Sequence, residues 1–163
     1  DYGRYPYRSW RTIGRSKEDR EAVAQALAET RLEAMRTRQV MSLSGGERQR
    51  AWIAMALARQ PEYLLLDEPT TYLDIAHQLE VMEIIKRLNR EHAMTVIMVL
   101  HDINHALQYA DEIAVIKDRQ IFSTGTPHDV LNVAMLAEVF GVRADIFTNS
   151  QGAQVLSPVS LVR

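Results

Sequence analysis

The most informative segment for the fold is Tyr63-Leu64-Leu65-Leu66-Asp67-Glu68. A short, wholly apolar run that ends in carboxylates is typical of a strand buried on both faces of a sheet. A second run of this kind, residues 95–100, follows further along the chain and ends at His101. Both runs are too short for ordinary helices, so we expect two buried strands.

The segment between these two runs predicts a helix. Asp74 is a good N-cap residue, and we expect the helix to extend to about Arg90. Its inward-facing side chains are expected to be Leu79, Met82 and Leu88. A strand, a helix and a strand of these lengths predict two parallel strands joined by a right-handed crossover, which is α/β architecture.

Two further helices are predicted upstream of this unit. Ser16 precedes an acidic first turn and resembles a capping residue, with Val23, Leu27 and Ala34 on one helical face. Ser44 is a second start signal, since Glu47 lies three residues later and can complete a capping box. The second helix is expected over residues 51–59, because Pro61 prevents it from continuing.

The downstream part of the chain predicts short strands and helices. Thr126-Pro127 is typical of a helix start, and Gly141 of a helix end. The expected strands pair as hairpins and cover residues 113–116, 120–123, 142–148 and 154–156. We therefore expect a helical part (1–60), a parallel βαβ core (61–110) and a small β/α tail (111–163) of the same domain.

Composition excludes several classes of protein. The 163 residues are 47% hydrophobic and 25% charged and carry a net charge of −2, which argues against a dedicated nucleic-acid binder. The longest apolar run, residues 51–58, is too short to span a membrane. There is no cysteine for disulfide or thiolate chemistry. The first residue is Asp1 and no signal peptide precedes it, so we expect a processed chain or a fragment.

The carboxylates Asp67 and Glu68 come where open α/β sheets bind ligands, at the carboxyl end of a strand. Neighbouring strand residues point in opposite directions, so the two carboxylates have different tasks. One can hold Mg²⁺ through water while the other orients an attacking water. The alternative is a polar strand end that caps the next turn, and this pair by itself does not decide between the two.

Leu43-Ser44-Gly45-Gly46-Glu47 indicates an anion site, because glycines at a helix N-terminus leave N–H groups bare and let a phosphate approach. A plain capped helix start is the alternative.

His101 can bind a phosphate or a metal. His101 and His105 stand four residues apart with Asp102 between, similar to the His-Glu-x-x-His pattern of zinc hydrolases. That pattern needs both histidines inside one helix and a glutamate as base, whereas His101 follows a strand and Asp102 is one methylene shorter. The remaining histidines are expected to be solvated: His77, His92, His105 and His128.

The first 15 residues mix four arginines with aromatic residues, which suits either nucleic acid or a membrane surface. We expect instead a loop whose aromatics pack on the domain. The aromatic residues are Tyr2, Tyr5, Tyr7 and Trp10.

The order of these motifs resembles the nucleotide-binding subunit of ABC transporters. Residues 43–50 resemble the signature motif, residues 63–70 Walker B, Leu73-Asp74 the D-loop, and His101 the H-loop. The four motifs are in register over residues 43–101, and a looser resemblance covers essentially the whole chain. Within the family, segments 70–75, 88–91 and 99–104 look most like importers of ferric siderophores, haem and cobalamin.

The resemblance implies a P-loop NTPase-like fold and a role for each residue. Asp67 would hold Mg²⁺, Glu68 would be the catalytic base, and His101 would bind the γ-phosphate of ATP. Asp74 would lie across the interface of a homodimer. The nucleotide site of the opposite subunit would be completed by Ser44, Gly45, Gly46 and Glu47.

The resemblance also implies partners. A face within residues 16–59 would meet a membrane permease, which in turn serves a substrate-binding protein. The subunit would act at the cytoplasmic face of the inner membrane, without nucleic acid, and import an iron-siderophore or related metal chelate.

Two departures stand out. Glu47 stands at a position where this family more often has glutamine, although both residue types occur there. The chain contains no Gly-Lys dipeptide and hence no Walker A loop, which supplies the phosphate cradle and the Mg²⁺-binding hydroxyl. We therefore expect the C-terminal part of such a subunit, poorly stable and inactive by itself.

The alternatives are a non-transport ABC-type ATPase acting on DNA or ribosomes, a zinc hydrolase using His101 and His105, and a catalytically dead binding module.

Overall fold

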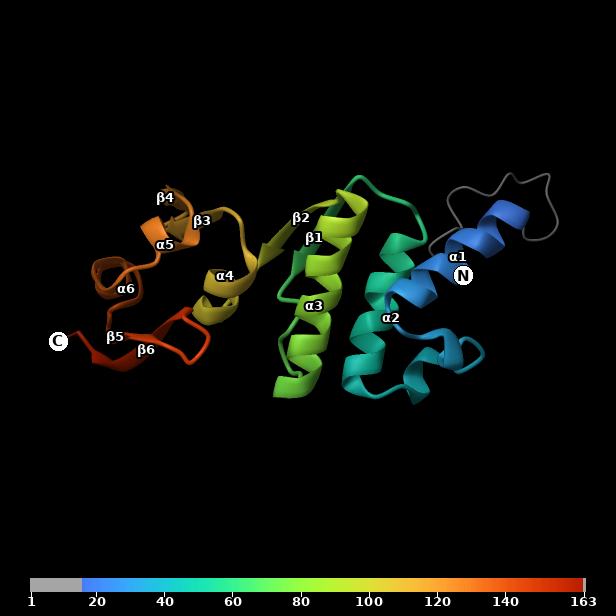
Figure 1. The fold of residues 1–163 in the computed structure, drawn as a ribbon, viewed down its shortest axis with the longest axis horizontal. Coiled ribbons are helices and arrows are strands. Elements are labelled where there is room, and N and C mark those ends of the chain that lie inside the picture. The colour runs from blue at the N-terminus through green and yellow to red at the C-terminus, as the bar shows by residue number, and fades with distance from the viewer. Residues whose placement is uncertain (1–15, 163) are drawn as a thin grey trace. The chain divides into compact units, whose positions relative to one another are not determined.

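The computed structural model describes residues 16–162, which form two compact units divided between Val99 and Leu100. The first unit contains helices and a two-stranded parallel sheet (Figure 1). Its elements are α1 (Lys17–Glu29), η2 (Glu33–Met35), η3 (Val40–Ser42), α2 (Gly45–Leu57), β1 (Tyr63–Asp67), α3 (Ile75–His92) and β2 (Thr95–Val99).

Side-chain caps set where the three longer helices begin. The Ser16 hydroxyl accepts a hydrogen bond from the Asp19 N–H at 3.0 Å, and Ser44 and Asp74 cap α2 and α3 in the same way. These three predicted caps are confirmed. The predicted range of α2 is wrong, because the helix begins directly after its cap, at Gly45 instead of residue 51.

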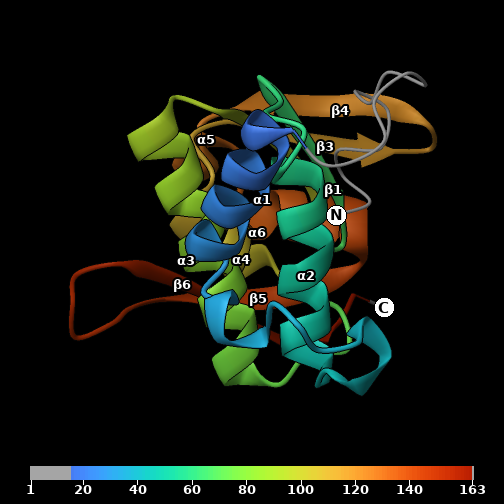
Figure 2. The ribbon, with the colours of Figure 1, turned by 90° about the vertical axis from the view of Figure 1, so that its right-hand side faces the viewer.

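The three helices pack together through small and aliphatic side chains. α2 contacts both of the other helices, and it lies beside α3 in Figure 1 and beside α1 in Figure 2. Met82 and Leu88 are buried as predicted, whereas Leu79 is 42% exposed. The helical face that packs instead consists of Val81, Met82, Ile84, Ile85 and Leu88.

The prediction that Ala34 continues the apolar face of α1 is also wrong. The helix ends at Glu29, and Arg31 adopts a left-handed conformation with φ of 56°, which stops it. Ala34 then lies exposed in η2. The buried face of α1 is formed by Asp19, Ala22 and Ala26.

The parallel pairing of the two strands is confirmed. β1 and β2 run in register from Tyr63 opposite Thr95 to Asp67 opposite Val99. The prediction that both faces are buried is wrong for the described residues. Leu64 is 3% exposed, but Leu65 on the opposite face is 72% exposed and Ile97 is 57% exposed. Within residues 16–99 these are the only two strands, α3 packs against β2, and no other described element covers the alternate side chains.

The second unit is built from short helices and two hairpins. Its elements are α4 (Ile103–Tyr109), β3 (Ile113–Lys117), β4 (Gln120–Gly125), α5 (Pro127–Val130), α6 (Val133–Phe140), β5 (Val142–Thr148) and β6 (Gln154–Leu161). Both predicted hairpins are confirmed as antiparallel pairs. Asp118 and Arg119 turn the first hairpin with φ of 49° and 65°, the backbone signature of a tight hairpin turn.

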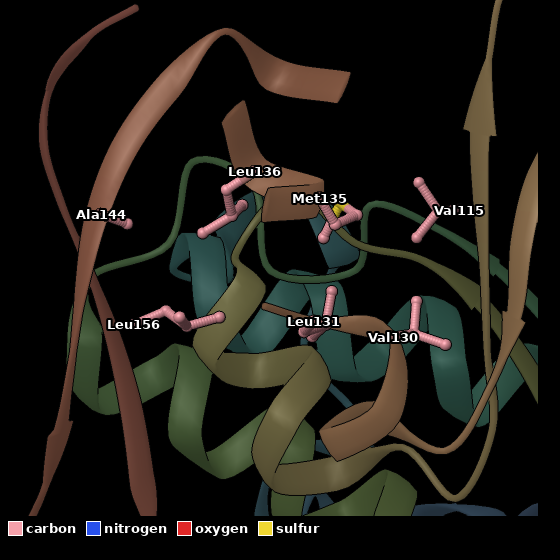
Figure 3. Packing of buried hydrophobic residues seen from close by; sticks show 7 residues of the cluster. All are labelled: Val115, Val130, Leu131, Met135, Leu136, Ala144 and Leu156. Carbon is pink, nitrogen blue, oxygen red and sulfur yellow. The ribbon is translucent and has the colours of Figure 1, made fainter. Parts of the chain in front are cut away.

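One apolar core holds the second unit together. Figure 3 shows Val115 from the first hairpin, Met135 and Leu136 from α6, and Ala144 and Leu156 from the second hairpin around a shared interior. Thr126 caps α5, and Gly141 ends α6 with φ of 66°, as predicted.

Candidate functional site

The N-terminus of α2 is fixed by a reciprocal capping box. The Glu47 N–H donates to Ser44 Oγ at 3.3 Å, and the Ser44 N–H donates to Glu47 Oε2 at 2.8 Å. The hydrogen bond from the Ser44 backbone lowers the pKa of Glu47 below its ordinary value. Ser44 and Gly45 are exposed at this helix start, so their backbone is accessible to a ligand.

Gly46 has a different environment from Gly45. Gly46 is buried, and a Cβ built on it would lie 1.9 Å from Cδ2 of His77. A Cβ on Gly45 would make only an ordinary contact, 3.9 Å from a methyl group of Leu73. The space that Gly46 leaves open is therefore taken by a side chain of α3, which gives this glycine a packing role that the sequence did not reveal.

Asp74 is tied to the same histidine. Its Oδ1 accepts a hydrogen bond from the His77 N–H at 2.9 Å and lies 2.7 Å from the ring Nδ1 of His77. These contacts, the backbone one first, lower the pKa of Asp74. His77 is expected to be a solvated histidine, and 34% of its side chain is exposed, but the ring also joins the start of α3 to the start of α2.

The two predicted carboxylates lie at the carboxyl end of β1, as expected from their place in the sequence. Asp67 is the last residue of the strand and is exposed, while Glu68 is half-buried. Glu68 has a φ of 46°, in the left-handed region that non-glycine residues rarely adopt. Its N–H donates to the Val99 carbonyl at 3.2 Å, so this turn is anchored to the neighbouring strand.

The Glu68 side chain is oriented by a residue that sequence reasoning missed. Thr71 Oγ1 donates a hydrogen bond to Glu68 Oε2 at 2.9 Å. The three-residue spacing of this polar pair is the signal that would have found it. A half-buried carboxylate in a strained turn, held by a hydroxyl, is suited to orienting a water molecule.

Asp67 is suited to bind Mg²⁺ as a single protein carboxylate that shares the ion with water and phosphate ligands. Among residues 16–162 no group of three or more His, Asp or Glu side chains can hold a metal ion. Mg²⁺ at nucleotide sites needs no such group, because one carboxylate, waters and substrate phosphates complete its six ligands. The exposed carboxylate of Asp67 at a strand end suits that role.

His101 belongs to the second unit, in an exposed bend between β2 and α4. Asp102 caps α4 by accepting hydrogen bonds from the N–H groups of Asn104 at 2.8 Å and His105 at 3.1 Å. His101 therefore lies outside the helix that contains His105, which does not favour the zinc-hydrolase alternative.

The prediction that His105 is solvated is wrong. It is 9% exposed and packs edge-on against Tyr109, with 6.0 Å between ring centroids. Its Nδ1 lies 3.9 Å from Asp102 Oδ2. This histidine is a packing residue of α4.

Two further expectations concern membranes. In the described part of the chain, no helix combines the length and the apolarity needed to span a bilayer. The basic and aromatic opening, with Tyr2, Tyr5, Tyr7 and Trp10, lies outside the described residues.

Comparison with known proteins agrees with the motif order. The ABC transporter family model matches residues 6–71. The petrobactin import ATP-binding protein FpuC of Bacillus anthracis is 56% identical over 152 residues, which are 93% of this chain and 55% of that protein. The iron(3+)-hydroxamate import ATP-binding protein FhuC of Bacillus subtilis (strain 168) is 46% identical over 91% of this chain and 55% of that protein.

Comparison with solved structures also finds similarity to ABC transporters. A solved structure of a transporter assigned to the metal-chelate type of ABC transporter, in an inward-facing conformation, matches with a TM-score of 0.87 and 28% identity. The match covers 96% of this chain and 64% of that one. This chain thus spans about half the length of the curated relatives it matches. In its α/β fold, its motif order and its sequence, the chain is therefore similar to the ATP-binding proteins of ABC importers.

Proposed function

We propose that this chain is part of the ATP-hydrolysing subunit of an ABC importer that takes up an iron-siderophore or a related metal chelate. The observation that carries the proposal is that three motifs belong to the first compact unit. They are the strand end with Asp67 and Glu68, the start of α2 with its exposed Gly45, and Asp74. The nature of the cargo is supported by the names of the relatives, which are petrobactin and iron(3+)-hydroxamate import proteins.

In this proposal Glu68 is the base that orients the water attacking the γ-phosphate. The hydrogen bond from Thr71 and the left-handed backbone restrict where the carboxylate can point. Asp67 would hold Mg²⁺ through water, and the ion would neutralise charge on the phosphates. His101 would donate a hydrogen bond to the γ-phosphate.

The remaining site residues would act on the nucleotide of a second copy. The N-terminus of α2 is formed by Ser44, Gly45, Gly46 and Glu47, and helix N-termini bind phosphate groups through backbone N–H groups. The capping box occupies the N–H groups of Ser44 and Glu47, so those of Gly45 and Gly46 are the ones that would face a phosphate. Asp74 would lie across the interface between the two subunits. The homodimer would sit on a membrane permease at the cytoplasmic face of the inner membrane, and the permease would receive cargo from a binding protein.

The phosphate loop is the component that this chain does not itself contain, since no Gly-Lys dipeptide occurs in it. We therefore assign ATP turnover to the complete subunit and expect none from the 163-residue chain alone. Purified chain that releases phosphate from Mg²⁺-ATP at a rate comparable to the complete subunit would overturn this assignment.

The residue roles are tested in the complete subunit by the substitution Glu68→Gln. Loss of the base is expected to lower ATP turnover roughly 100-fold or more, while nucleotide affinity is retained because the phosphate contacts remain. Glu62→Gln is the matched control, since Glu62 is an exposed carboxylate at the other end of β1. Normal turnover in Glu68→Gln would contradict the assigned role.

Transport is tested separately, in cells that depend on a siderophore for iron. We expect deletion of the complete subunit to abolish uptake of radiolabelled iron-siderophore, and expression of the unmodified subunit to restore it. Restoration by the Glu68→Gln variant would show that transport does not depend on the proposed hydrolysis.

A further inference from the structure

The contact between the starts of α2 and α3 leaves no space at Gly46. A Cβ at this position would lie 1.9 Å from Cδ2, 2.5 Å from Cγ and 2.9 Å from Cβ of His77. Real Cβ atoms do not approach other carbon atoms so closely, so any other residue at position 46 displaces the imidazole ring. The glycine and the histidine are therefore sterically matched.

The opposite edge of the same ring is held by Asp74. The ring Nδ1 lies 2.7 Å from Asp74 Oδ1, and the backbone N–H of His77 donates to that oxygen at 2.9 Å. Rotating the ring away from Gly46 would break the side-chain hydrogen bond. Asp74, His77 and Gly46 thus form a continuous chain of contacts from one proposed site motif to the other.

We propose that His77 is a positioning residue that fixes the loop carrying Asp74 against the helix start carrying Ser44 and Gly45. The inference rests on the proposed function, which assigns those three residues to the nucleotide and to the second subunit. With His77 in place, the two motifs move as one body and present a single preformed surface. Without it, the capping box of α2 and the cap of α3 remain, but their relative placement is no longer fixed.

The two contacts of His77 require different parts of its side chain. The Cδ2 edge fills the space at Gly46, and Nδ1 reaches Asp74. Alanine lacks both parts. Asparagine places a planar amide where the nearer half of the imidazole lies, with its nitrogen close to the position of Nδ1. Rescue by asparagine therefore separates this positioning role from a general effect of changing an α3 residue.

His92 supplies a matched control. It lies in the same helix, its side chain is 34% exposed like that of His77, and its Nε2 lies 3.0 Å from Glu29 Oε1. It is at the far end of α3, away from the proposed site motifs.

The first test measures ATP hydrolysis by the complete subunit with the substitutions His77→Ala, His77→Asn and His92→Ala. We expect His77→Ala to lower kcat about 10-fold with KM for ATP within about twofold, because misplaced groups slow the reaction without removing ground-state contacts. His77→Asn should keep most of the parental kcat, and His92→Ala should match the parent. Parental kcat in His77→Ala, or equal losses in the alanine and asparagine variants, would overturn the proposal.

The second test does not depend on ATP. A double-mutant cycle compares the urea unfolding midpoints of Gly46→Ala, His77→Ala and the combined variant in the complete subunit. If the ring and the glycine are matched, Gly46→Ala should lower the midpoint strongly when His77 is present and only slightly when position 77 is alanine. Additive shifts would overturn the positioning role. If the cycle shows coupling but the unmodified subunit has no ATP turnover, the proposed function is refuted and the coupling of Gly46 and His77 remains established.

Discussion

Asn104 and Leu156 exchange two hydrogen bonds although they are 52 residues apart in the chain. Asn104 Nδ2 donates to the Leu156 carbonyl at 3.0 Å, and the Leu156 N–H donates to Asn104 Oδ1 at 2.9 Å. The side-chain amide thus behaves like the backbone of one more strand residue beside β6. This contact ties α4, which follows His101, to the last hairpin of the second unit.

Replacing Asn104 by Leu should destabilise the second unit. Leu156 is 2% exposed, so its N–H and carbonyl would lose their partners without gaining water. We expect a loss of about 1–3 kcal/mol in the free energy of unfolding, measured by urea denaturation of the complete subunit. Gln108→Leu on the exposed side of the same helix is the control and should change stability little. Equal stability of both variants would show that the amide pair contributes nothing.

Ser44→Ala should loosen the first turn of α2. The substitution removes the acceptor for the Glu47 N–H, and loss of such a cap weakens a helix by about 0.5–2 kcal/mol. Amide hydrogen exchange is expected to accelerate at residues 46–48 and to stay unchanged at the start of α3. Unchanged protection at Glu47 would contradict the cap. The exposed Ser150, changed to Ala, provides the comparison.

Low pH should destabilise the N-terminal turns of α2 and α3. The pKa values of Glu47 and Asp74 are lowered, chiefly by backbone hydrogen bonds from Ser44 and His77 respectively. Each charged carboxylate therefore contributes stability that is fully present above its unfolded-state pKa and is lost as the pH falls through its lower folded-state pKa. The urea concentration at the unfolding midpoint should therefore decrease when the pH is lowered below about 4. Glu47→Gln and Asp74→Asn should flatten this dependence, and an unchanged slope in both would refute it.

The core of the second unit should be sensitive to truncation at Leu136. This side chain is fully buried, and Leu→Ala changes at such sites destabilise proteins by about 2–5 kcal/mol. Leu161→Ala is the paired control, because Leu161 is 73% exposed at the end of β6. Circular dichroism during thermal unfolding distinguishes the two variants, and similar melting temperatures would argue against the core in Figure 3.

Local signals explain what the sequence predicted well. Caps depend on residues three apart, and the caps at Ser16, Ser44, Asp74 and Thr126 are all present. The parallel pairing of β1 and β2 followed from two apolar runs and the length of the helix between them. The carboxylates of the proposed site were found because a strand end is visible in sequence.

What depends on distant neighbours was predicted poorly. The side chains of Leu65 and Leu79 are as apolar as those of Leu64 and Leu88, but nothing among the described residues covers them. His77 looks like an ordinary polar residue in sequence, and its packing partner Gly46 lies in another helix. Tertiary packing, not residue type, decides these positions.

The backbone of Glu68 has a consequence for how this position can change over generations. A φ of 46° suits glycine or asparagine better than glutamate. Random mutation followed by selection for folding alone would therefore drift toward those two residues and would improve stability on the way. Glutamate at residue 68 therefore has a backbone cost, which a functional demand on its carboxylate would offset. A lineage released from that demand should lose this side chain early, before its core begins to change.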